Sequence, residues 1–381
     1  MTKPRARDLG IRIGTMEPGP LNAITDVAGV RVGHRTLISG EGRLVVGRGP
    51  VRTGVTVIQP HDGNIWTEPL YAAPHRLNGN GEMTGLEWMR ESGLLTSPVA
   101  ITNTHSVGVV RDALIEHDIH TRGAEVLSWG LPVVAETWDG RLNDINGFHV
   151  TRNHVFEALD SAAGGPVAEG SVGGGTGMVS FGFKAGIGTA SRRVPVGDQG
   201  GARHDYTLGV LVQSNFGRRE RLTVGGVPVG RTLTAQRIPL PDEPPRSSET
   251  GSIIAIAATD APLLPHQCAR VAQRIGLGIG RIGGAGGNFS GDIFLCFATG
   301  NRGLNASVVT PTARLTAIVE TLDDGRLDHL FHAVIEATEE AILNAMLAAD
   351  TMTGRDDVTA HALPPEELVS ILEAGWSPIS R

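Results

Sequence analysis

The pattern of apolar and polar positions predicts strands and helices in mixed order along the first two thirds of the chain. Short β-rich runs occur at 54–60 and 97–104, and a clearer strand at 206–217. Apolar residues three and four positions apart predict helices over 107–117 and 152–163. The glycine-dense stretch between the second helix and the last strand also alternates apolar positions, which suits strands whose backbones approach closely.

The last third continues this mixture around a very apolar segment, SIIAIAATDA, which predicts a buried strand over 252–261. Asp260 is a candidate N-cap and Pro262 suits the first turn of the helix that follows, which we expect to end at Gly276. The other elements predicted here are a strand at 292–299 and helices at 327–349 and 364–375. Apolar strands flanked by amphipathic helices predict an α/β protein with sheets inside and helices outside.

The clearest break in the pattern is RIPLPDEPPRSSETGS at 237–252. Its four prolines make it a poor helix and a poor strand. We therefore expect a surface loop that ends where the buried strand begins.

Composition and charge narrow the function classes. The net charge of −7 is spread along the chain without a basic stripe, which argues against a nucleic-acid partner. Cys268 and Cys296 have no metal-site spacing and are expected to be small buried hydrophobes. The N-terminus lacks the apolar region of a secretory signal, and no window is apolar and long enough to span a bilayer. We expect a cytoplasmic protein that needs neither metal nor cofactor.

The boundary between the loop and the strand carries the candidate chemistry. A serine hydroxyl can attack the carbonyl carbon before it, and Gly251 is the residue type that best tolerates the unusual backbone this requires. Hydrolysis of the resulting ester would leave Ser252 as a new N-terminus on a rigid strand. Its α-amine, with an ordinary pKa of about 7.7–8.0, could then accept the proton of its own hydroxyl. A Gly-Ser dipeptide alone is more often an ordinary turn.

Three other residues could support such a serine. Ser290 and Asp292 are two positions apart, so both side chains share one face if a strand has begun. Asn215 ends the 206–217 strand, where its amide could donate to an oxyanion. Taken alone, the first two would be a turn cap, and Asn215 an ordinary strand-ending turn residue.

A second polar group occurs at ETWDGRLNDINGFHV, 136–150. Glu136, Asp139 and Trp138, with the polar run 143–146, could form a pocket for a cationic amine, held by a carboxylate and a ring face. A polar loop that caps the helix starting near Thr151 is an equally good interpretation.

Two glycine motifs imitate nucleotide-binding loops. GLGIGRIGG at 276–284 has the glycine spacing of a dinucleotide fingerprint, but a helix precedes it and a strand follows, which reverses the required context. GGGTG at 173–177 lacks the Lys-Ser/Thr of a P-loop. Neither is expected to bind phosphate.

Long strings of the sequence resemble the L-aminopeptidase/D-amidase/D-esterase family, which includes the β-peptidyl aminopeptidases. The resemblance runs in order from near the N-terminus to about residue 350. The strings are NGNGEMTGLEWMRESG (78–93), ITNTHSVG (101–108), ETWDGRLNDINGFHV (136–150), VGGGTGMVSFGFKAGIGTASR (172–192), VLVQSNFG (210–217), TGSIIAIAATDAPL (250–263) and SGDIFLCFATGN (290–301).

The resemblance implies one catalytic domain over 1–381 that cuts itself into an α chain, 1–251, and a β chain, 252–381. It implies a four-layer αββα sandwich, similar to N-terminal nucleophile hydrolases but differently connected. It also implies assembly into a tetramer of αβ pairs.

Site residues follow from the resemblance position by position. Ser252 is the nucleophile, Ser290 and Asp292 are its supporting serine and acid, and Asn215 is the oxyanion donor. Glu136 is the carboxylate that holds the substrate's free amine, and Trp138 shapes the pocket. The sequence departs from some members at two positions, since Asp292 replaces a glutamate and Trp138 a tyrosine.

The implied activity is removal of an N-terminal residue from short peptides, amides or esters through an acyl-enzyme. Two alternatives remain open at this point. One is acyl transfer like that of ornithine acetyltransferases, which normally use threonine as nucleophile. The other is a non-catalytic protein with glycine-rich binding loops.

Overall fold

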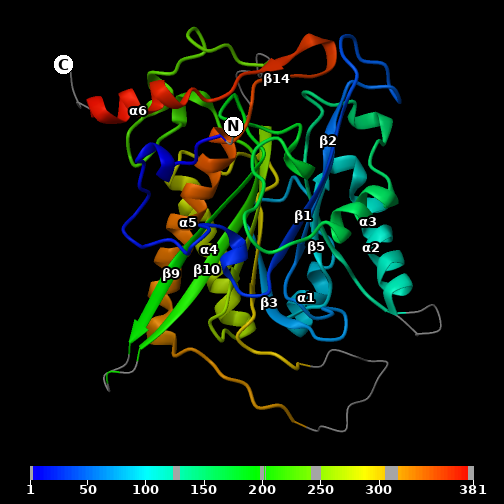
Figure 1. Cartoon of the computed structure of the whole chain (residues 1–381), viewed down its shortest axis with the longest axis vertical. Coiled ribbons are helices and arrows are strands. Elements are labelled where there is room, and N and C mark those ends of the chain that lie inside the picture. The colour runs from blue at the N-terminus through cyan, green and yellow to red at the C-terminus, as the bar shows by residue number, and fades with distance from the viewer. Residues whose placement is uncertain are drawn as a thin grey trace.

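A computed structural model describes residues 3–122, 129–197, 201, 203–241, 250–304 and 316–375. These residues form two main sheets, each with helices on its outer face (Figure 1). Residues 242–249, the central half of the predicted proline-rich loop, lie outside the described ranges.

The smaller sheet has the strand order β1-β2-β5-β6. Two helices, α2 and α3, cover its outer face through a layer of aliphatic side chains that includes Val57, Val110 and Val155. The elements are β1 (Arg31–Ser39), β2 (Val51–Gln59), β5 (Val99–Asn103), β6 (Val133–Thr137), α2 (Val107–Arg122) and α3 (Arg152–Asp160).

The larger sheet has the order β4-β3-β13-β11-β10-β9, and the short β12 pairs with the start of β11. Its outer face packs against α4 and α5. The elements are β3 (Leu70–Arg76), β4 (Leu94–Leu95), β9 (Ile187–Gly197), β10 (Arg203–Asn215), β11 (Thr250–Thr259), β12 (Phe289–Ser290), β13 (Ile293–Ala298), α4 (Pro265–Arg281) and α5 (Leu327–Leu347).

The remaining elements are short. They are α1 (Leu86–Ser92), α6 (Pro365–Ala374), the hairpin of β7 (Val179–Ser180) with β8 (Phe183–Lys184), and the hairpin of β14 (Met352–Thr353) with β15 (Thr359–Ala360).

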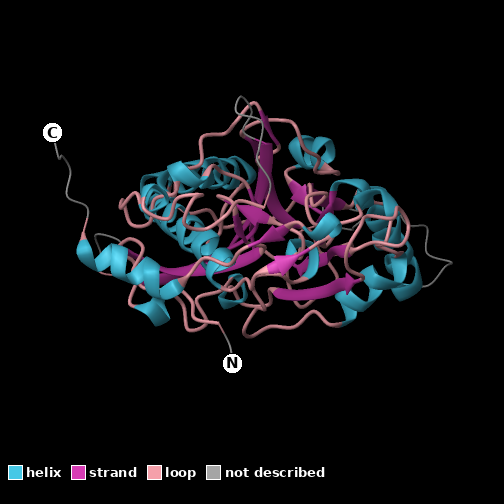
Figure 2. Cartoon of the chain, turned by 90° about the horizontal axis from the view of Figure 1, so that it is seen from above, coloured by secondary structure: helices cyan, strands magenta, loops and turns pink. Residues whose placement is uncertain are grey.

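The two sheets face each other across a buried apolar layer. Alternation along β11 divides its side chains between two cores: Ile254 and Ile256 face the other sheet, whereas Ala255 and Ala257 face α4 and α5. Seen from above, helices lie on both sides of the paired sheets (Figure 2). The predicted αββα sandwich is therefore confirmed, and β11 is an interior strand of its larger sheet.

The predicted strands and helices match observed elements, with errors at the ends of α4. The helix begins at Pro265 with Leu264 as N-cap, so the predicted cap at Asp260 is wrong. Asp260 instead accepts a hydrogen bond from the backbone N–H of Thr207 at 2.7 Å, on the neighbouring strand.

The helix also continues beyond Gly276 to Arg281, so the predicted end is wrong. Gly278 shows why a glycine-rich sequence stays helical here. A Cβ at this position would lie 2.6 Å from the carbonyl oxygen of Ile335 on α5. The absence of a side chain thus lets α4 and α5 approach closely. The motif at 276–284 serves helix packing.

Cys268 and Cys296 are buried and free, as predicted. Within the part of the chain that the structure describes, no helix is long and apolar enough to cross a membrane.

Candidate active site

Ser252 lies near the start of β11, between β10 and β12. Its partner across the antiparallel β10–β11 pair is Asn215, the last residue of β10. The side chain is buried, and its Oγ accepts a hydrogen bond from the backbone N–H of Gly291 at 3.1 Å. The fold therefore fixes this hydroxyl on a rigid strand, with a backbone donor aimed at its oxygen.

Gly251 precedes it in a conformation that few other residues adopt, with φ +152°. A Cβ here would lie 2.5 Å from the carbonyl oxygen of Asn215. The carbonyl oxygen of Gly251 accepts from the N–H of Gly291 at 3.3 Å, so that one donor contacts both this oxygen and the Ser252 hydroxyl. The peptide bond before Ser252 thus has unusual geometry and a donor beside its carbonyl.

Ser290 and Asp292 meet next to Ser252. The Ser290 hydroxyl donates to Oδ1 of Asp292 at 2.6 Å, and the same oxygen accepts from the backbone N–H of Ile253 at 3.2 Å. Asn78 fixes the carboxylate further, because its Nδ2 donates to Oδ2 at 2.8 Å. A hydroxyl and a carboxylate are thereby held one residue from the backbone nitrogen of Ser252.

The side-chain amide of Asn215 is fixed at both ends. Its Oδ1 accepts from the N–H of Val179 at 3.0 Å, and its Nδ2 donates to the carbonyl of Trp138 at 2.8 Å. One donor and one acceptor orient the amide uniquely. Because the amide nitrogen carries two protons, a second N–H remains to donate elsewhere.

Glu136 lies on β6 and is buried. Its Oε1 accepts from the backbone N–H of Glu82 at 2.9 Å, and its Oε2 accepts from the hydroxyl of Thr104. Burial raises the pKa of this carboxyl, and the two hydrogen bonds oppose the rise.

Gly81 connects Glu136 to the serine. A Cβ on Gly81 would lie 2.8 Å from Cα of Gly291 and 3.2 Å from Oε1 of Glu136. The backbone of Gly81 therefore sits between the carboxylate and the residue whose N–H contacts Ser252. A buried carboxylate from the smaller sheet and a serine from the larger sheet share one site.

The polar run after Glu136 is mostly occupied by structural contacts. Asp139 accepts from Asn143 Nδ2 at 3.0 Å, and burial raises its pKa to about 6. Asp144 accepts from the N–H of Gly47 at 2.7 Å and contacts His149 Nε2 at 2.9 Å. The alternative that this loop caps α3 is wrong, since Thr151 caps the helix together with His154.

Trp138 leaves 45% of its surface exposed, while its carbonyl holds Asn215. Part of this residue is therefore accessible to a ligand. The GGGTG segment has no such access: a Cβ on Gly174 would lie 2.3 Å from Gln213 Oε1, so the loop is packed between the sheets.

Several functional groups at this site could not be recognised from residue types in the sequence. The donors to Ser252 and Glu136 are backbone N–H groups, those of Gly291 and Glu82, and Gly81 acts by lacking a side chain. Asn78 and Gly81 fall within the NGNG string at 78–81, whose repeated glycines hint at close backbone approach.

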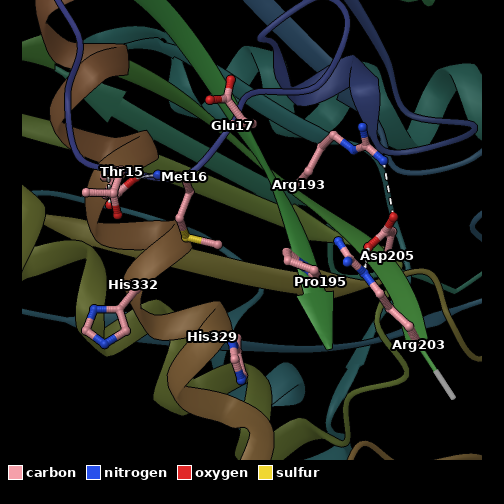
Figure 3. A pocket seen from close by; sticks show the side chains of 10 residues that line it. Thr15, Met16, Glu17, Arg193, Pro195, Arg203, Asp205, His329 and His332 are labelled. Carbon is pink, nitrogen blue, oxygen red and sulfur yellow. Dashed lines mark hydrogen bonds and ion pairs between the residues drawn. The ribbon is translucent and has the colours of Figure 1, made fainter. Parts of the chain in front are cut away.

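A separate cavity of about 630 Å³ lies on another part of the molecule (Figure 3). The N-terminal segment, the last part of β9, the start of β10 and the first three turns of α5 surround it. Arg193 and Asp205 form an ion pair there at 3.2 Å, and His329 and His332 are exposed at its edge. None of the candidate site residues lines it.

Comparisons with known proteins agree with this architecture. The model of peptidase family S58 matches residues 22–360. A β-peptidyl aminopeptidase from Sphingosinicella microcystinivorans is 50% identical over 97% of this chain and 92% of its own.

Two solved structures superpose closely. A β-aminopeptidase from a Burkholderia species has a TM-score of 0.88 at 50% identity, over 98% of this chain and 100% of that one. The L-aminopeptidase D-Ala-esterase/amidase of Ochrobactrum anthropi has a TM-score of 0.86 at 44% identity, over 98% and 99%. That enzyme is described as a prototype of the serine aminopeptidases and a variant of the N-terminal nucleophile hydrolase fold.

The fold is therefore that of a variant N-terminal nucleophile hydrolase, and the protein is a hydrolytic enzyme of the aminopeptidase class. The chain belongs to peptidase family S58. This assignment gives no support to a non-catalytic binding protein or to acyl transfer of the ornithine acetyltransferase kind.

Proposed function

We propose that the protein is a precursor that cuts itself between Gly251 and Ser252 and then works as a serine aminopeptidase with Ser252 as nucleophile. The observation that carries this proposal is the Ser252 hydroxyl, fixed on β11 by the Gly291 N–H beside a glycine of unusual backbone geometry. Cleavage would divide the chain into residues 1–251 and 252–381.

Self-cleavage needs the Ser252 Oγ to attack the Gly251 carbonyl carbon. The C–N bond then breaks, the nitrogen takes a proton to become the α-amine, and an ester joins Gly251 to the serine oxygen. Water hydrolyses this ester and regenerates the hydroxyl. The Gly291 N–H, 3.3 Å from the Gly251 carbonyl oxygen, would stabilise the negative charge that forms there.

In turnover, the new α-amine is the general base. It takes the Ser252 hydroxyl proton as Oγ attacks the substrate's first carbonyl, and it donates that proton to the leaving group. Ser290 and Asp292 lie one residue from this nitrogen, where they would orient the amine and stabilise its protonated form. Asn215 would donate its second N–H to the oxyanion. Water then attacks the acyl-enzyme.

Glu136 supplies the selectivity for a free N-terminus. Its carboxylate comes from the opposite sheet and lies within one residue of Gly291 through Gly81. A substrate ammonium group between this carboxylate and Ser252 would place the first carbonyl at the nucleophile. The substrates are therefore short peptides, amides or esters with an unblocked amine.

The names of the relatives extend the substrate class. Because similar proteins are β-peptidyl or β-aminopeptidases, we include N-terminal β-amino acids among the candidates. A panel of α- and β-aminoacyl p-nitroanilides tests the proposal. We expect release of nitroaniline from substrates with a free amine, and a protein that hydrolyses none of them would contradict the proposal.

Assembly into a tetramer and a cytoplasmic location stay predictions.

Glu136→Gln is expected to weaken recognition of substrates with a free amine. A hydrogen bond to a charged group contributes about 1.5–3 kcal/mol, so the inhibition constant of an amino-acid amide should rise roughly 10- to 100-fold. The N-acetylated amide should be affected much less. Both compounds are tested as inhibitors of p-nitroanilide hydrolysis. An inhibition constant can be obtained even for a compound that the enzyme hydrolyses poorly.

Glu82→Gln is the matched control. It removes a nearby negative charge but keeps the backbone N–H that donates to Glu136. The control should change both constants only slightly. Equal effects of Glu136→Gln on the free and the acetylated amide would exclude the amine-clamp role.

Gly291→Ala is expected to slow both self-cleavage and turnover. The new Cβ would lie 2.6 Å from the Asn80 carbonyl oxygen and from Cα of Gly81, so backbone must move. The N–H that contacts Ser252 would move with it, and the loss of one buried hydrogen bond of about 1–3 kcal/mol predicts a roughly 5- to 150-fold fall in each rate. Timed denaturing electrophoresis and steady-state kinetics measure the two effects.

Gly280→Ala provides the control on a helix. Its Cβ would meet nothing within 4 Å, so it should raise the free energy of unfolding by about 0.5–1 kcal/mol and leave both rates unchanged. Normal rates in Gly291→Ala would mean that this N–H does not act on Ser252.

A further inference from the structure

Lys184 is a buried amine for which neither the fold nor the catalytic steps above provide a reason. It ends β8, and its side chain is fully buried. Its Nζ donates to the carbonyl oxygens of Met178 at 3.0 Å and Ala185 at 2.6 Å. No carboxylate among the described residues offsets its burial, which lowers the pKa of the amine to about 7.

The neutral amine fits this environment. It carries two N–H groups, and two carbonyl oxygens accept from it. A methionine would fill a similar volume without the cost of burying an amine. We therefore looked for the function of the Lys184 amine in the backbone groups that it contacts.

The peptide that Lys184 contacts leads directly to Asn215. The carbonyl of Met178 accepts from Lys184, and the other end of the same peptide, the N–H of Val179, donates to Oδ1 of Asn215 at 3.0 Å. The amide of Asn215 then donates to the Trp138 carbonyl. One chain of hydrogen bonds therefore runs from Lys184 through this peptide to the candidate oxyanion donor, Asn215, and continues to the Trp138 carbonyl.

The peptide plane transmits position from one end to the other. Because a peptide unit is planar, fixing its carbonyl also fixes the direction of its N–H. A donor on the carbonyl also polarises the peptide and strengthens the N–H as a donor. The backbone N–H of Ala185 donates to the same Met178 carbonyl at 3.0 Å, so Lys184 supplies the second of two donors.

We propose that Lys184 is a positioning residue for the hydrolytic reaction: through the Met178–Val179 peptide it holds the amide of Asn215 in the orientation that stabilises the oxyanion. This inference rests on the proposed role of Asn215. We expect Lys184 to affect the stability of the transition state and not the binding of substrate, because its amine contacts only backbone carbonyls among the described residues.

A double-mutant cycle tests the proposal. Lys184→Met keeps most of the side-chain volume and removes both donors, and it is combined with Asn215→Ala. With kcat expressed per active site, from titration with an irreversible serine-directed reagent, Lys184→Met should lower kcat about tenfold and change KM less than twofold. In the Asn215→Ala background the same substitution should lower kcat less than twofold, because residues that act as a unit are not additive.

Lys184→Gln is the second variant, for use if Lys184→Met does not fold. Its shorter side chain retains an N–H donor, so its kcat should lie between those of the wild type and Lys184→Met. The cycle with Asn215→Ala can be completed with either substitution.

Arg219→Met is the matched control, because the Arg219 side chain contacts the same β7–β8 hairpin from outside it. Arg219 is also buried, and it donates to the carbonyls of Phe181 at 2.7 Å and Gly182 at 2.9 Å, which do not lead to the Asn215 side chain. We expect a lower melting temperature but an unchanged kcat per active site. A loss of kcat as large as that of the lysine variant would show a general effect of the hairpin and overturn the proposal.

The outcomes separate this inference from the proposed function. If Asn215→Ala lowers kcat but Lys184→Met does not, or if Lys184→Met lowers it equally in both backgrounds, the role of Lys184 is overturned and that of Asn215 stands. If Asn215→Ala leaves kcat unchanged, the oxyanion assignment fails and the inference fails with it.

Discussion

Replacing Ser252 by alanine is expected to abolish both self-cleavage and hydrolysis. Both reactions begin with an attack by the same oxygen. The hydroxyl of Ser290, on the adjoining β12, is not free to replace it, because it is bound to Asp292 at 2.6 Å. Loss of a serine nucleophile typically lowers turnover by roughly 10⁴-fold or more. Denaturing electrophoresis should show one chain near 40.0 kDa, and nitroaniline release should fall to background.

Ser214→Ala is the matched control for this prediction. Ser214 is also a buried serine, on the neighbouring strand, and its hydroxyl contacts that of Ser180 at 2.7 Å. The control should be cut and remain active. A Ser252→Ala protein that is still cut, or that still turns over substrate at the wild-type rate, would show that the nucleophile lies elsewhere.

Replacing Asn215 by alanine is expected to cause the second-largest loss. Removal of one oxyanion donor typically costs about 2.7–4 kcal/mol, which corresponds to a fall in kcat of roughly 10²- to 10³-fold. KM should change little, because the negative charge develops only in the transition state. Kinetics on a p-nitroanilide substrate, with kcat expressed per active site, measure both parameters.

Gln213→Met is the control for the loss of a buried amide from the same strand. Its Nε2 donates to the Thr102 carbonyl at 2.9 Å and to the Thr137 hydroxyl at 2.8 Å, inside the layer between the sheets. This variant should be less stable but keep its kcat. An Asn215→Ala enzyme whose KM rises while kcat is unchanged would assign Asn215 to ground-state binding instead.

The fold was largely predictable because its strands and helices have clear periodicity. SIIAIAATDA reads as a buried strand, and the alternation along β11 divides its residues between two cores. The errors lie at helix ends. Gly276 looks like a stop signal, yet α4 continues because Gly278 packs against α5, a tertiary contact that the local sequence does not contain.

The side chains of the candidate site were also predictable, since Ser290, Asp292 and Asn215 surround Ser252 as expected. The backbone groups were not. Every residue other than proline has an N–H, so nothing in the sequence distinguishes that of Gly291 as the donor to Ser252. Lys184 was missed for a related reason, because a lysine between apolar residues gives no indication of which carbonyls it will contact.

The two sheets explain why this site needs the whole fold. The larger sheet supplies Ser252 and Asn215, and Asp292 directly precedes its strand β13. The smaller sheet supplies Glu136 on β6 and the carbonyl of Trp138 just after it. Residues 78–81 connect the two groups through Asn78 and Gly81. We expect the two products of self-cleavage to stay together, because β11 and β13 of the second product remain paired with β10 and β3 of the first in the larger sheet.

Intact-mass spectrometry of the purified protein after prolonged incubation tests the central claim most directly. We expect two chains, residues 1–251 and 252–381, whose masses together exceed that of the precursor by one water molecule. N-terminal sequencing of the smaller chain should begin Ser-Ile-Ile. A single uncut chain of 40.0 kDa that hydrolyses aminoacyl p-nitroanilides, or a cut at any other bond, would contradict the account.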